Sequence, residues 1–139
     1  MGLSVPRVSV LMTALALLMS TVGAVGLAPR AEAVTCVVSS NEADTIDAGL
    51  GRGPFAWPGG EAKLKITYRT PSSNIMIRVR LVRNGNSTGT TLKGNAGRQV
   101  TKTVGLGYQP RSSTTLWFEP AGASPDSHRM IYSYCLYKA

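Results

Sequence analysis

Residues 62–82 of the chain read AKLKITYRTPSSNIMIRVRLV, and this stretch decides the predicted fold. Apolar and polar residues alternate on both sides of a Pro-Ser-Ser-Asn sequence at residues 71–74. Period-two alternation rich in β-branched side chains indicates β-strands, whereas proline, serine and asparagine are typical of turns. The stretch therefore predicts two antiparallel strands that form a hairpin.

The alternation also predicts the register of this hairpin, with Thr70 opposite Ile75. In that register the apolar residues share one face, and they are Leu64, Ile66, Tyr68, Ile77, Val79 and Leu81. A slip by one residue would turn the whole set toward solvent, so the pattern fixes the pairing. These residues are the predicted core.

The opposite face of the predicted hairpin is basic, and it comprises Lys63, Lys65, Arg78 and Arg80, with Arg69 and Arg83 at its ends. The register would place Lys65 beside Arg80 and Thr67 beside Arg78. Like charges that face each other on a sheet cost up to about 1 kcal/mol per pair. Such a face is either solvated, where charged side chains also prevent edge-to-edge association, or covered by an anionic partner.

The N-terminal residues have the pattern of a secretory signal peptide. A weakly basic start precedes an apolar run at residues 8–28, and residues 31–33 form an Ala-Glu-Ala cleavage site. We expect cleavage after Ala33, and a run of this length also admits an uncleaved membrane anchor. The sequence thus predicts a secreted, extracellular protein with no stable membrane insertion after cleavage.

Residues 34–139 predict one small basic domain, since about 106 residues suffice for one hydrophobic core. Of the 15 Lys and Arg and the 7 Asp and Glu of the chain, 13 and 6 lie in this part, a net charge of about +7. Such a charge favours anionic partners such as cell-wall polymers, lipid headgroups, nucleic acids or acidic proteins.

The two cysteines lie near opposite ends of this predicted domain. Cys36 is its third residue, and Cys135 is the fifth from its end. Two cysteines in an exported protein indicate one disulfide, Cys36–Cys135. No CxxC motif is present, and one histidine with two distant cysteines does not read as a zinc site. The sequence therefore predicts no cofactor and no metal.

The rest of the predicted domain consists of short strands between turn residues. Strands are predicted at residues 34–39, 99–104, 114–119 and 129–137, with shorter ones near 45–48 and 90–93. Six or seven short strands predict an all-β, antiparallel β-sandwich. An immunoglobulin-like or fibronectin-like topology is compatible with this order, although the Cys…Trp…Cys spacing of immunoglobulin domains is absent.

Glycine and proline predict a loop at residues 51–60, GRGPFAWPGG, which nevertheless carries Phe55 and Trp57. Aromatic residues in such a loop either plug the end of a core or form a contact surface. Further aromatic residues are Tyr108, Trp117, Tyr132 and Tyr134.

Export, basic charge and aromatic residues together predict a non-enzymatic binding module. Cations and aromatic rings suit an anionic polymer or a cell-surface carbohydrate, through charge and stacking respectively. An extracellular protein is the other expected partner, and nucleic acid is disfavoured because no recognised motif is present. The predicted site comprises Lys63, Lys65, Arg69, Arg78, Arg80, Phe55 and Trp57.

Two alternative functions stay open from the sequence. A small disulfide-closed domain can inhibit an extracellular hydrolase through a preorganised loop, and residues 51–60 and 84–97 are the candidates. A small hydrolase or nuclease could use His128, the single histidine, with nearby Asp126 and serines or with Glu119. Common residue types in one loop do not make a catalytic triad, so the enzyme hypothesis is disfavoured.

Overall fold

The computed structural model describes residue 2, residues 33–122 and residues 128–139. The predicted signal peptide lies outside these residues except at Gly2 and Ala33. Residues 34–139 form one compact unit. In the described ranges, no helix is long and apolar enough to cross a membrane.

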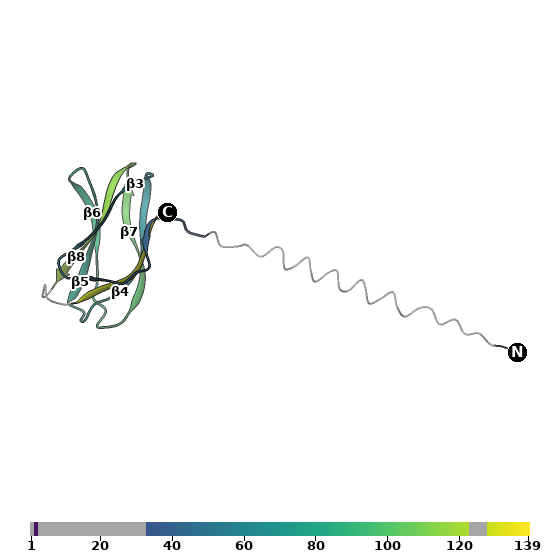
Figure 1. Cartoon of the computed structure of the whole chain (residues 1–139), viewed down its shortest axis with the longest axis horizontal. Coiled ribbons are helices and arrows are strands. Elements are labelled where there is room, and N and C mark those ends of the chain that lie inside the picture. The colour runs from purple at the N-terminus through teal and green to yellow at the C-terminus, as the bar shows by residue number, and fades with distance from the viewer. Residues whose placement is uncertain (1, 3–32, 123–127) are drawn as a thin grey trace. The chain divides into compact units, whose positions relative to one another are not determined.

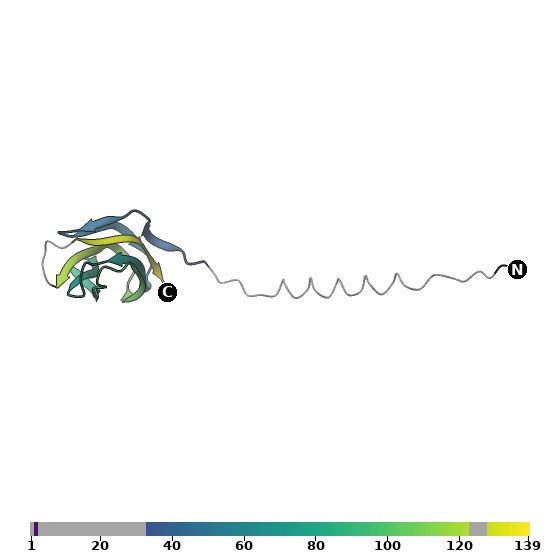
Figure 2. The ribbon, with the colours of Figure 1, turned by 90° about the horizontal axis from the view of Figure 1, so that it is seen from below.

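The described residues contain nine β-strands, which form two antiparallel sheets stacked as a sandwich (Figures 1 and 2). Sheet A has the order β1-β9-β4-β7, with β2 also paired to β9, and sheet B has the order β3-β8-β5-β6. The strands are β1 (Cys36–Ser40), β2 (Asp44–Ile46), β3 (Leu50–Trp57), β4 (Gly60–Arg69), β5 (Ile75–Arg83), β6 (Asn86–Leu92), β7 (Val100–Gln109), β8 (Ser112–Gly122) and β9 (Arg129–Lys138). The predicted all-β sandwich is confirmed, with more strands than the six or seven expected.

The strand order is that of a double-sheet jelly roll, to which β2 is an addition. In immunoglobulin sandwiches the last strand lies at the edge of its sheet. Here the last strand, β9, lies between β1 and β4 inside sheet A. The topology therefore differs from the immunoglobulin-like and fibronectin-like ones with which the sequence was compatible.

The predicted hairpin is not formed, because β4 and β5 lie in different sheets. β4 pairs with β7 and β9, whereas β5 pairs with β6 and β8. The segment between them carries the chain from one sheet to the other. The predicted pairings of Lys65 with Arg80 and of Thr67 with Arg78 are therefore wrong.

The predicted core is correct even though the predicted pairing is wrong. All six predicted core residues have 0% exposure: Leu64, Ile66, Tyr68, Ile77, Val79 and Leu81. They meet across the sandwich, those of β4 from sheet A and those of β5 from sheet B. Each fully buried side chain of this size contributes about 1.5–3 kcal/mol. Phe118 and Tyr134 add a tilted ring pair between the sheets, with centroids 5.2 Å apart.

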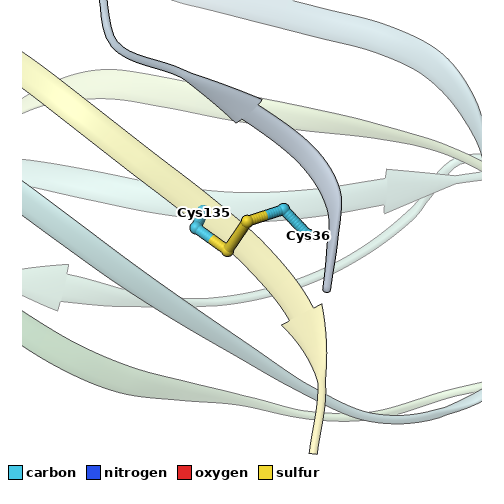
Figure 3. Close-up of a disulfide and its surroundings, with 2 residues drawn as sticks. All are labelled: Cys36 and Cys135. Carbon is cyan, nitrogen blue, oxygen red and sulfur yellow. A yellow bond between two sulfur atoms is a disulfide. The ribbon is translucent and has the colours of Figure 1, made fainter. Parts of the chain in front are cut away.

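The predicted disulfide joins Cys36 on β1 to Cys135 on β9, two neighbouring strands of sheet A (Figure 3). The Cα atoms are 5.3 Å apart, and the two residues are 99 positions apart in the chain. The bond therefore links the first and last strands of the compact unit.

Two arginine side chains connect the sheets, Arg129 in the interior and Arg52 in a partly exposed position. Arg129 on β9 is 1% exposed. Its Nε donates to the carbonyl oxygen of Met76 on β5 at 2.6 Å, and its Nη2 donates to that of Ala121 on β8 at 2.8 Å. Arg52 on β3 donates from Nη2 to the carboxylate of Asp44 on β2 at 2.7 Å. Each arginine thus links one sheet to the other.

Residues 51–60 are for the most part a strand, in contrast to the predicted loop. They contribute most of β3, an edge strand of sheet B. Trp57 is 1% exposed, and its Nε1 donates to the carbonyl oxygen of Gln109 at 3.1 Å. Phe55 is partly buried and packs against the core. Both rings therefore act as plugs, and Trp57 offers no exposed ring to a ligand.

Candidate binding face

Trp117 lies on the outer face of sheet B, in the middle of β8. The alternation of this strand buries its neighbours Leu116 and Phe118 and turns the indole outward, 37% exposed. In the described ranges, the other exposed large hydrophobic residues are Val34 and Tyr108. An exposed ring in the middle of a sheet adds little to the core and presents a flat apolar surface to solvent.

The indole of Trp117 lies against the backbone of the neighbouring strand β3. Gly51 is its ladder partner there. A Cβ atom on Gly51 would lie 3.1–3.3 Å from Cη2, Cζ2 and Cζ3 of the indole, closer than most side chains approach. Glycine at this position allows the six-membered ring to approach the backbone. The ring is therefore supported by β3 instead of standing free in solvent.

Arg80, the ladder partner of Trp117 on the other side, lies against a second glycine. Gly89 on β6 pairs with Arg80, and a Cβ there would lie 3.0 Å from Cγ of the arginine and overlap a carbonyl oxygen of β5. The guanidinium forms an ion pair with Glu119 through Nη2, and Nη1 donates to Oγ of Ser87 at 3.4 Å. The ion pair fixes the direction of both charged groups.

Two shallow hollows border this row of side chains. The larger, about 530 Å³, lies beside the indole, and it is lined by Asp47, Ala48, Gly49, Trp117, Glu119 and Pro120. The smaller, about 160 Å³, is lined by Arg78, Arg80, Gly89, Thr90 and Thr91. We call the combined surface the Trp117 face, defined by Asp47, Arg78, Arg80, Trp117 and Glu119. It combines one flat ring with hydrogen-bond acceptors on one side and donors on the other.

The five predicted basic residues do not form one face. Arg78 and Arg80 lie on the outer face of sheet B, whereas Lys63, Lys65 and Arg69 lie on that of sheet A. The reason is the crossing between the sheets after β4, which places the two halves of the expected surface on opposite sides of the sandwich. The prediction of a single basic hairpin face is therefore corrected to two separate basic groups.

The structure describes only some of the residues considered for catalysis. His128 is exposed, with Nδ1 at 3.8 Å from Oδ1 of Asp47. Glu119 is paired with Arg80. Asp126 and the serines at 124 and 127 lie outside the described residues. The side chains of His128 and Asp47 are both largely exposed to solvent.

The segments considered as inhibitory loops are largely edge strands of sheet B. Residues 51–60 contribute to β3, and residues 84–97 contain β6. An edge strand held in a ladder presents its outward side chains as part of a sheet surface. The strand portions of both segments are therefore held within sheets and are not free loops.

The comparisons with known proteins concern the fold. No protein-family model matches the sequence, and no curated protein matches it. Among solved structures, the chain is similar to the C-terminal CBM6 of a marine laminarinase from Zobellia galactanivorans, with a TM-score of 0.50 and 10% identity over 75% of this chain and 94% of that chain. It is also similar to a CBM61 in complex with β-1,4-galactotriose, with a TM-score of 0.48 and 8% identity over 70% and 69%. At these identities, the first similarity shows a β-sandwich fold shared with a carbohydrate-binding module.

Proposed function

We propose that this protein is a secreted, non-catalytic carbohydrate-binding module that binds its ligand on the Trp117 face. The observation that carries the proposal is the exposed indole of Trp117, supported on Gly51 beside a hollow that contains two carboxylates. The fold shared with a CBM6 supports the proposal.

The chemistry of the face suits a sugar chain. A pyranose ring presents C–H groups on its face and hydroxyl groups around its edge. The indole would stack on the C–H face, while Asp47 and Glu119 would accept hydrogen bonds from hydroxyl groups and Arg78 would donate them. Charged partners form the stronger hydrogen bonds, and the pairing of Arg80 with Glu119 orients both groups in advance. A shallow face of this kind fits a chain that passes across the sheet.

Replacing Trp117 by alanine is expected to weaken polysaccharide binding at least about 30-fold, because truncating an aromatic anchor costs about 2 kcal/mol or more. The measurement is co-sedimentation with insoluble curdlan, galactan, mannan, cellulose and chitin. Trp117→Phe should retain part of the affinity. Val34→Ala, which also removes an exposed apolar side chain, is the matched control. Absence of binding to the whole panel, or binding that survives Trp117→Ala, would contradict the proposal.

Replacing Gly51 by valine tests whether the support of the indole matters. The new side chain would push the ring away from β3, while the strand itself accepts a β-branched residue. We expect roughly ten-fold weaker binding, with the unfolding free energy changed by less than about 1 kcal/mol. Co-sedimentation reports the affinity, and urea unfolding reports the stability. Unchanged binding would show that the ring functions without this support.

A further inference from the structure

We infer that the outer face of sheet A is a second binding surface, for an anionic polysaccharide. It lies on the side of the sandwich opposite the Trp117 face. The inference is independent of the proposed function, because it rests on different residues and on charge instead of ring stacking.

Three cations lie in one row along β4. Lys63, Lys65 and Arg69 are exposed, and they alternate with the buried residues Leu64 and Ile66. Residues two apart on a strand are about 6.6–6.8 Å apart along its axis. β4 lies inside sheet A, between β9 and β7, so the row runs over the middle of the face. A linear polyanion laid along β4 would meet the positive charges in succession.

The neighbouring strands leave this row without carboxylate partners. In the part of the chain that the structure describes, the ion pairs involve Arg52, Arg80 and His128, and none includes the three cations of β4. The ladder neighbours of the lysines are uncharged, namely Gly105 and Tyr137 beside Lys63, and Thr103 and Cys135 beside Lys65. Glu61, at the start of β4, is the carboxylate that this strand contributes. Binding of an external anion would therefore relieve repulsion within the row.

The same face favours a sugar chain over a membrane or a nucleic acid. It offers hydroxyl groups beside the cations, for example Oγ1 of Thr67 and of Thr101, 2.7 Å apart. Its exposed large ring is Tyr108, which is opposite Glu61 at one end of the row. Insertion into a bilayer needs a broad apolar surface, and single-stranded nucleic acid is bound by aromatic rings interleaved along the cationic groove. Hydroxyl groups and a row of cations suit the sulfate, carboxylate and hydroxyl groups of an anionic polysaccharide.

The test measures binding of the full folded domain to heparin at several salt concentrations. Three charge contacts predict a slope of about −2 to −3 for log K against log salt, so affinity should fall roughly 16- to 64-fold between 50 and 200 mM NaCl. The triple variant Lys63→Gln, Lys65→Gln, Arg69→Gln should bind at least ten-fold more weakly at 50 mM NaCl, with a slope near zero.

The matched control removes the same charge elsewhere, through Arg83→Gln, Arg98→Gln and Arg111→Gln, and should stay within about three-fold of the unmodified protein. Equal losses in both triple variants would overturn the inference, because binding would then follow net charge alone. Tighter binding to phosphatidylglycerol vesicles or to oligo(dT) than to heparin would overturn it in favour of a membrane or nucleic-acid partner. Thermal unfolding midpoints confirm that both triple variants are folded.

Measuring each variant against both ligands distinguishes the two surfaces. Trp117→Ala should lose neutral polysaccharide and retain heparin, whereas the triple variant of β4 should lose heparin and retain neutral polysaccharide. If only the results expected for Trp117→Ala are not observed, the proposed function is contradicted. If only the results expected for the triple variant of β4 are not observed, the inference about sheet A is contradicted. Protein held on heparin resin should also capture soluble neutral glycan if both faces bind at once.

Discussion

Replacing both cysteines, as Cys36→Ser with Cys135→Ser, is expected to lower the free energy of unfolding by about 4 kcal/mol. The bond joins residues 99 positions apart, and closing a loop of this length removes a large share of the entropy of the unfolded chain. Domains of this size have unfolding free energies of about 5–15 kcal/mol. The thermal midpoint should therefore fall by roughly 15–30 °C.

Urea unfolding followed by tryptophan fluorescence measures this loss directly. The unmodified protein treated with dithiothreitol is the matched control. It should unfold at the same urea concentration as the double variant, since both lack the same bond. A change below 1 kcal/mol in both would contradict the expectation. It would mean that pairing of β1 with β9 holds the chain ends together without the bond.

For the two strands of the predicted hairpin, the sequence predicted which side is buried but not which strands are neighbours. The alternation through Leu64, Ile66 and Tyr68 and through Ile77 and Val79 marks the inward side correctly. A hairpin within one sheet and a crossing between two sheets bury the same residues, so alternation cannot distinguish them. The error therefore left the core prediction intact and displaced only the outer surface.

The binding face was partly predictable. Alternation in the predicted strand at residues 114–119 places Trp117 on the side opposite Leu116 and Phe118, so the outward direction of the indole could have been inferred. The missing information was in the edge strands, where Gly51 and Gly89 read as loop residues. In the structure these glycines make room for the side chains of Trp117 and Arg80 from the neighbouring strands. Such contacts depend on strands distant in sequence, so composition alone could not reveal them.

Arg129 begins the strand predicted at residues 129–137, and its burial was not predicted. Alternation contains no signal that a charged side chain enters the interior. Burial lowers the pKa of its guanidinium from the ordinary value, and the nearby carboxylate of Asp47 offsets part of this effect. The hydrogen bonds to Met76 and Ala121 compensate for the lost hydration, which is the usual condition for a buried charge.

Replacing Arg129 by alanine is accordingly expected to lower the free energy of unfolding by about 3–5 kcal/mol. The change removes a large buried side chain and leaves two carbonyl oxygens in the interior without their donor. Arg129→Lys should lower the free energy of unfolding by less than Arg129→Ala does. It should still be destabilising, because a single ammonium cannot reproduce the two directed hydrogen bonds of the guanidinium. The measurement is urea unfolding at pH 7, with the exposed Arg98→Ala as control, expected within about 0.5 kcal/mol of the unmodified protein. Equal stability of Arg129→Ala and Arg98→Ala would mean that the hydrogen bonds of Arg129 do not contribute to holding sheet A to sheet B.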